Sequence, residues 1–263
     1  MEPNEVHQTK KQIGAKIWAI LKEIDPDYYS RCQANFTQWH VTARQMRDKH
    51  FTSIKDYLAT RALDCGAKSV SPLSDSGRPA TDSFVSWVVR MMGWTSGVVL
   101  TPEEEEQTGP VTYLAYVVLA VTNDIWSWEK EKRVTKKSGG SIPLVNAVQM
   151  IMQIHDTDEE SAKRVVYNII REHEERYCCL RDDYLKRSDT SLSIKKWFQI
   201  LELSIAGNAL WSIRAIRYHQ DVQNPYRGSF DFPSVFSSLR ITQFTPDMGS
   251  GNGDIAGMLL LPP

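Results

Sequence analysis

Apolar residues recur with the spacing of an α-helix along most of this sequence, and no stretch alternates apolar and polar residues as a half-buried strand does. Short segments rich in Pro, Gly, Asp and Ser separate the periodic stretches, among them "SPLSDSGRPATDS", "TPEEEEQTGP" and "KKSGGSIP". The pattern predicts an all-α fold, with helices at about 5–23, 34–50, 53–65, 80–93, 110–133, 143–154, 158–187 and 194–218.

The pattern also predicts one domain followed by a tail. A chain of 263 residues with 41% hydrophobic residues can bury a large core, which we place in residues 1–220. From about residue 221 the helical periodicity ends in "NPYRGSFDFPSVFSS" and "TPDMGSGNGD", so we expect 221–263 to be a linker or a disordered tail.

Charge and apolar run length exclude several classes of partner. The formal net charge is −1, which offers no overall attraction to nucleic acid or to an anionic membrane. The N-terminal residues lack the apolar core of a signal peptide, and the longest apolar stretch, within 111–121, is too short to cross a bilayer. The four cysteines have no paired CxxC spacing. We therefore expect a cytoplasmic protein with reduced thiols and no stable membrane insertion.

The segment "VTNDIWSWEKEKR", residues 121–133, carries a polar stripe. Asn123, Ser127 and Glu131 follow one another at four-residue spacing, so they drift by only about 80° and share one face of a helix. An amide oxygen, a hydroxyl and a carboxylate are the oxygen ligands that suit Mg²⁺, and Lys130 adds a cation that can reach a phosphate bound to the same ion. The simpler alternative is a solvated face of an amphipathic helix. Against it, Tyr116, an apolar residue farther up the same face, indicates that the stripe points inward.

These residues resemble a known family. "NDIWSWEKE" is similar to the second metal-binding motif of class I terpene cyclases, N-D-x-x-S-x-x-K-E, in which Asn, Ser and Glu bind one Mg²⁺. Five specified positions would match by chance about 10⁻⁴ times in a chain of this length. The resemblance implies the class I isoprenoid-synthase helical bundle.

Two further segments carry the resemblance. "YLATRALDCGA" resembles the helix break that senses diphosphate, which implies that Arg61 is the sensor, Asp64 the linker, and Cys65 or Gly66 the effector. "GNALWSIRAIRYH" resembles the late helix with an Arg-Tyr pair, which implies that Arg217 and Tyr218 bind diphosphate. Trp211, seven residues before Tyr218, would line the substrate pocket or simply pack in the core, and Asn208 stays unassigned.

The sequence between these motifs most resembles that of fungal cyclases of the di- and sesterterpene type, which are often fused to a prenyltransferase. The resemblance implies that Mg²⁺, Arg61, Lys130, Arg217 and Tyr218 help an allylic prenyl diphosphate, C20 or C25, to ionise and cyclise with release of diphosphate. Aromatic faces would stabilise the cation, with Phe84, Trp87 and Trp211 as candidates.

One feature of the family is missing. The sequence contains no D-D-x-x-D/E motif. The similar segment "RDDYLKR", with Asp182 and Asp183, lacks the final acid, and we interpret it as a solvated helix face. We therefore expect an N-terminally truncated cyclase domain of low activity, with a separate N-terminal segment or a prenyltransferase domain as its partner. Two alternatives remain. A chain-elongating prenyl synthase would use aspartate clusters for both metal motifs, and a decayed, non-catalytic relative would bind a partner through this helical surface.

Overall fold

The predicted all-α fold is confirmed. The computed structural model describes residues 3–30, 33, 49–65 and 84–218, and within these ranges the regular structure is helical throughout, without a strand. The helices are α1 (Pro3–Ile24), α3 (Ile54–Cys65), α4 (Phe84–Thr95), α5 (Pro102–Lys137), α6 (Ala147–His155), α7 (Glu159–Lys186) and α8 (Leu192–Arg214), followed by the short 3₁₀ helix η1 (Ile216–Tyr218). Most of the helix expected at 34–50, and the whole tail expected at 221–263, lie outside the described residues.

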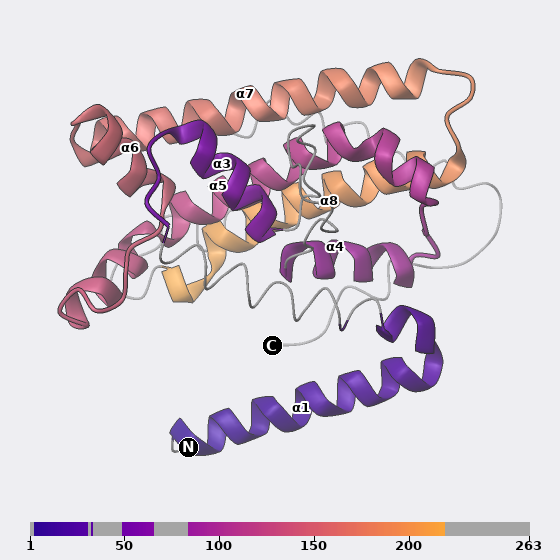
Figure 1. Cartoon of the computed structure of the whole chain (residues 1–263), viewed down its shortest axis with the longest axis horizontal. Coiled ribbons are helices and arrows are strands. Elements are labelled where there is room, and N and C mark those ends of the chain that lie inside the picture. The colour runs from indigo at the N-terminus through magenta and orange to yellow at the C-terminus, as the bar shows by residue number, and fades with distance from the viewer. Residues whose placement is uncertain (1–2, 31–32, 34–48, 66–83, 219–263) are drawn as a thin grey trace.

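Helix α5 is the centre of the fold. It packs against α3, α6, α7, α8 and η1, and Figure 1 shows α7 running along its length with α8 beside it. Every residue from 114 to 122 is buried, so α5 is covered on all sides over more than two turns. A helix that is apolar all round has no solvent face, which explains why the stretch around 111–121 is the most apolar of the chain.

Helix α5 begins eight residues earlier than the expected start at 110. Thr101 is its N-cap: the Thr101 hydroxyl accepts from the backbone N–H of Glu104 (3.2 Å), and the Glu104 carboxylate accepts from the backbone N–H of Thr101 (3.0 Å). Pro102 occupies the first helical turn, where its missing N–H costs nothing. Pro110 then lies inside the helix rather than at its start. The capping box at Thr101, not the proline, marks the beginning of the helix.

Helix α8 ends earlier than expected, at Arg214 rather than 218. Ala215 leaves the helical conformation with ψ 114°, and residues 216–218 form η1. The chain therefore turns just before Arg217 and Tyr218, and η1 packs against α5. Gly93 of α4 lies close both to the backbone that follows α4 and to α8. A Cβ added at Gly93 would stand 3.1 Å from the Val98 carbonyl oxygen and 3.4 Å from the Trp197 ring.

A second, smaller cluster holds α1 in place below the bundle in Figure 1. Leu21 and Tyr28 are buried there, and the Tyr28 ring stacks on Trp94 of α4 at 5.0 Å between centroids. The Trp94 indole N–H also donates to the Asp25 carboxylate (3.0 Å). Among the described helices, none is long and apolar enough to cross a bilayer.

Candidate active site

The polar stripe of α5 faces the interior. Ser127 is only 1% exposed, and Asn123 and Glu131 are half-buried. Tyr116, which precedes the stripe on the same side of the helix, is also buried. The alternative of a solvated stripe is therefore wrong, and these three side chains need partners inside the protein.

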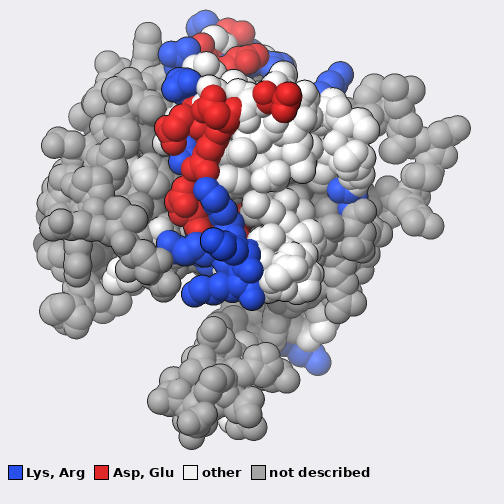
Figure 2. Space-filling view, turned by 90° about the vertical axis from the view of Figure 1, so that its left-hand side faces the viewer, with Lys and Arg blue, Asp and Glu red and all other residues white. Residues whose placement is uncertain are grey.

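The opposite flank of α5 does face solvent. There Lys132 pairs with Glu159 of α7 (2.6 Å), and Lys163 pairs with Glu159 (2.7 Å) and lies 3.6 Å from Glu129. Figure 2 shows acidic and basic side chains in adjacent bands on this face of the molecule. The pKa of Glu159 is lowered to about 2, because the hydrogen bonds from the two lysines outweigh its burial. These acidic and basic side chains of α5 and α7 thus pair with one another on the exposed flank.

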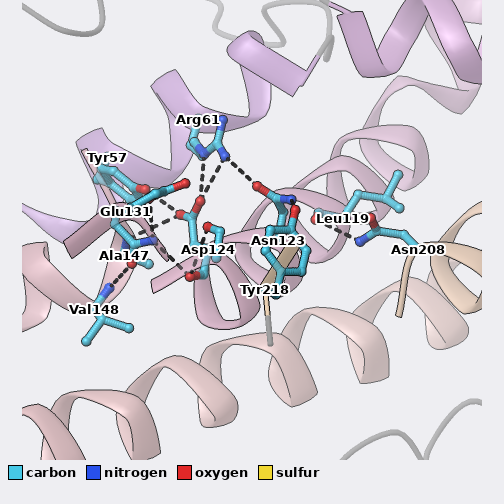
Figure 3. A network of polar contacts seen from close by, with 12 residues as sticks. Tyr57, Arg61, Leu119, Asn123, Asp124, Glu131, Ala147, Val148, Asn208 and Tyr218 are labelled. Atoms are coloured by element: carbon cyan, nitrogen blue, oxygen red, sulfur yellow. Dashed lines mark hydrogen bonds and ion pairs between the residues drawn. The ribbon is translucent and has the colours of Figure 1, made fainter. Parts of the chain in front are cut away.

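Asp124, for which the sequence analysis proposed no role, is the hub of the interior network (Figure 3). Its carboxylate, 1% exposed, accepts from Arg61 Nε (3.1 Å) and Nη2 (2.8 Å), from the Tyr57 hydroxyl, and from the backbone N–H of Ala147 (3.2 Å). Burial, followed by the Asp124 charge, raises the pKa of Tyr57 well above its usual range, so Tyr57 stays a donor. Asp124 therefore joins α3, α5 and α6.

Arg61, the expected diphosphate sensor, lies beside the stripe. Besides its two bonds to Asp124, its Nη2 lies 3.5 Å from Asn123 Oδ1, at the long limit of a hydrogen bond. Its side chain is 15% exposed. A guanidinium that is held by a buried carboxylate on one edge is a preorganised donor for phosphate oxygens.

Tyr218 approaches the stripe from the other side. The Asn123 Nδ2 donates to the Tyr218 hydroxyl (2.8 Å), and Tyr218 is buried. Its ring packs edge-to-face with Trp211, 5.4 Å between centroids, although Trp211 is 48% exposed. Arg61, Asn123 and Tyr218, which come from three separate elements, thus lie in a row (Figure 3).

The other candidate residues lie on α3, α4, α5, α8 and η1. Lys130 is half-buried directly before Glu131. Asn208 donates to the Leu119 carbonyl (3.2 Å) and so joins α8 to α5. The backbone places some candidates whose side chains lie outside the described part of the chain: Asp64 and Cys65 at the end of α3, Phe84 and Trp87 on α4, and Arg217 on η1. Gly66 is not described at all.

Several neighbours of Glu131 act on the pKa of its carboxyl group. Burial, followed by the nearby Asp124 charge, raises the pKa of Glu131, while hydrogen bonds from Asn146 and Ser127 and the charge of Arg61 oppose the rise. Asn146, which the sequence analysis also missed, donates from Nδ2 to Glu131 Oε2 (3.0 Å). A carboxylate in such surroundings is stabilised by any cation that binds it.

The stripe fits a hard divalent cation. Its donors are an amide oxygen, a hydroxyl oxygen and a carboxylate, the set that Mg²⁺ prefers, and Arg61 stands ready for the negative charge of a ligand on that cation. The residues described here contain no cluster of three His, Cys, Asp or Glu side chains that could hold a metal. Asp183 pairs with Lys186, and both are exposed, as expected for a solvated face. Asp182 is instead half-buried, and its partner Arg181 also pairs with Glu202 of α8.

Known proteins share this fold and much of this sequence. The crystal structure of aristolochene synthase from Penicillium roqueforti superposes with a TM-score of 0.53 at 21% identity, covering 75% of this chain and 59% of that one, and it shares the fold. A conidiogenone synthase of Penicillium roqueforti (strain FM164) is 35% identical over 243 residues, which cover 91% of this chain and 30% of the relative. A cyclopiane-type diterpene synthase of Penicillium chrysogenum is 34% identical over 239 residues, covering 91% and 28%.

This chain spans less than a third of the length of those two relatives. The sequence model described as "Terpene synthase family 2, C-terminal metal binding" matches residues 17–176, which include α3, α5 and α6 and therefore Asp124 and the groups that donate to its carboxylate. The chain belongs to the terpene synthase family.

Proposed function

We propose that this chain binds an allylic prenyl diphosphate, promotes loss of its diphosphate, and cyclises the resulting cation to a terpene hydrocarbon. One observation carries the proposal: Asn123, Ser127 and Glu131 line the inner face of α5 within reach of Arg61 and Tyr218. A C20 or C25 substrate is favoured, and the similarity to a diterpene synthase supports C20.

In the proposed reaction, Asn123 Oδ1, Ser127 Oγ and the Glu131 carboxylate hold the cofactor, Mg²⁺. When bound, Mg²⁺ supplies Lewis-acid neutralisation of the diphosphate charge. Arg61 donates to the diphosphate oxygens and stays oriented because Asp124 holds its Nε and Nη2. Tyr218 and Lys130 add a hydroxyl donor and a positive charge for the departing diphosphate, and we assign Arg217 the same role by resemblance.

The carbon–oxygen bond then breaks, leaving an allylic cation on the substrate and both bonding electrons on the diphosphate. After cyclisation the cation loses a proton, which the released diphosphate accepts, to give the neutral hydrocarbon. Aromatic faces stabilise such a cation without attacking it, and Trp211 is the residue we assign to this role because its ring contacts Tyr218. We further propose that a prenyltransferase supplies the linear substrate, either as another domain or as a separate protein.

The test has two parts. In the first, thermal unfolding is followed with Mg²⁺, with inorganic pyrophosphate, and with both. The midpoint should rise most with both, since each ligand binds only the folded site. Glu131→Gln should abolish this rise, whereas Glu129→Gln, two residues away on the exposed flank, should leave it intact. A wild-type protein that is indifferent to both ligands would instead favour a non-catalytic, partner-binding relative.

In the second part, the purified chain is incubated with Mg²⁺ and C15, C20 or C25 prenyl diphosphate, and hydrocarbon and released diphosphate are measured. We expect slow, EDTA-sensitive turnover, because this sequence contains no D-D-x-x-D/E motif to bring further cations to the diphosphate. Fast turnover would contradict the expectation of an impaired chain while supporting the assignment as a cyclase.

A further inference from the structure

Asn146 is a fully buried asparagine directly before α6. Its side-chain amide makes three hydrogen bonds, one through Oδ1 and two through Nδ2. Its Oδ1 accepts from the backbone N–H of Val148 (2.9 Å), which makes it the N-cap of α6. Its Nδ2 donates to the Asp124 carbonyl (2.8 Å) and to Glu131 Oε2 (3.0 Å). Asn146 thus contacts α5 at two positions, seven residues apart, on either side of Ser127.

The orientation of this amide follows from its partners. If the amide were turned over, its NH₂ group would face the Val148 N–H, and its oxygen would face the Asp124 carbonyl and the Glu131 carboxylate. Donor would then face donor, and acceptor would face two acceptors. The NH₂ group must therefore point at Glu131.

Capping alone does not require an asparagine. The caps of α5, α7 and α8 are Thr101, Asp158 and Ser191, and each offers only an acceptor to the helix N-terminus. Ser, Thr and Asp cap about as well as Asn. What Asn146 adds is the pair of N–H donors aimed at the metal motif of α5.

We propose that Asn146 is a positioning residue for Glu131: it holds Oε2 and thereby sets the direction in which the carboxylate presents its oxygens to a divalent cation. The inference rests on the proposed function, in which Glu131 is a metal ligand. Hydrogen-bonded partners behind a metal ligand restrict its rotamers, and removing such a partner weakens metal binding by about 10- to 100-fold. Asn146 also donates to the Asp124 carbonyl. The same amide therefore fixes the turn of α5 that carries Asp124, whose carboxylate binds Arg61.

The test compares Mn²⁺ binding in the presence of inorganic pyrophosphate, measured from the electron paramagnetic resonance signal of free Mn²⁺. Asn146→Ser and Asn146→Thr keep a capping oxygen and remove the NH₂ group that donates to both the Asp124 carbonyl and Glu131. Both variants should fold, as judged by circular dichroism, and should bind Mn²⁺ about 10- to 100-fold more weakly than the wild type. Ser191→Ala is the matched control: it removes a helix cap far from the metal motif, and it should destabilise the fold without changing Mn²⁺ affinity.

Glu131→Gln distinguishes a failure of the proposed metal site from a failure of the positioning role of Asn146. If the wild type binds Mn²⁺ no better than Glu131→Gln, the proposed metal site is wrong, and the role of Asn146 falls with it. If Glu131→Gln weakens binding while both Asn146 variants bind like the wild type, the metal site stands and the positioning role is refuted. The double variant Asn146→Ser/Glu131→Gln should bind Mn²⁺ with the same affinity as Glu131→Gln alone, because Glu131, the residue that Asn146 positions, no longer binds the cation.

Discussion

The ion pair between Asp124 and Arg61 allows a quantitative prediction. Asp124→Asn keeps the size of the side chain but removes the charge that faces Arg61, and its NH₂ group must oppose at least one of the donors from Tyr57, Arg61 or Ala147. Breaking a buried ion pair by removing one partner costs about 3–5 kcal/mol. Because the Arg61 side chain is 15% exposed and keeps some hydration, we expect a loss of about 3 kcal/mol, at the lower end of that range.

The assay is urea unfolding followed by far-UV circular dichroism and tryptophan fluorescence. A loss of about 3 kcal/mol is a large part of the 5–15 kcal/mol typical of a folded domain, so the transition midpoint should shift clearly. Asp183→Asn is the control, because Asp183 and Lys186 are both at least 70% exposed and such pairs contribute about 0.5 kcal/mol or less. A loss below about 1 kcal/mol for Asp124→Asn, with an unchanged denaturant slope, would refute the view that Asp124 is the buried hub of the network.

Three further predictions concern the scaffold, each measured by the same unfolding assay. Thr101→Ala should cost about 1 kcal/mol by removing the N-cap of α5, and Thr101→Ser should restore it; equal stability of the two variants would mean that the capping box does not set the start of the helix. Gly93→Ala should destabilise by about 1 kcal/mol, because the new methyl group meets the backbone of the next loop and a tryptophan ring, whereas Gly207→Ala, with open space around it in α8, should stabilise by up to about 1 kcal/mol. Burial lowers the pKa of His173, so the unfolded chain takes up the proton first as the pH falls below about 6.5, and stability that is present above that pH is lost. His173→Gln should therefore lose less stability than the wild type between about pH 7.5 and pH 5, and His155→Gln, at an exposed position, should follow the wild type.

Helix positions were predictable where apolar periodicity and caps agree. The helices expected at 158–187 and 53–65 are found at 159–186 and 54–65, and Asp158 caps the first of them. The end of α8 was not predictable, because no Gly or Pro follows Arg214 and the chain leaves the helix at an alanine. There η1 turns onto α5, so tertiary packing decides the boundary.

The inward direction of the Asn123 stripe was also predictable, because apolar residues continue the same face. Asn146 was not. It follows Asp124 by 22 residues across a loop, and neither helical spacing nor a turn signal connects the two positions. Its local environment in the sequence indicates only an N-cap, which is half of what its amide does.

Asp124 shows why a one-face argument fails for a central helix. It stands about 100° around the helix from Asn123, so on an amphipathic surface helix it would belong to a different environment from the stripe. Yet α3, α6, α7 and α8 all pack against α5, so more than one of its faces is buried, while the flank that carries Glu129 and Lys132 faces solvent. The face that carries Asp124 meets Arg61 of α3 and Ala147 of α6, while the adjacent face carries the stripe. A buried carboxylate between an arginine and a helix N-terminus therefore holds in place a guanidinium that also reaches Asn123, and the two faces belong to one connected polar network.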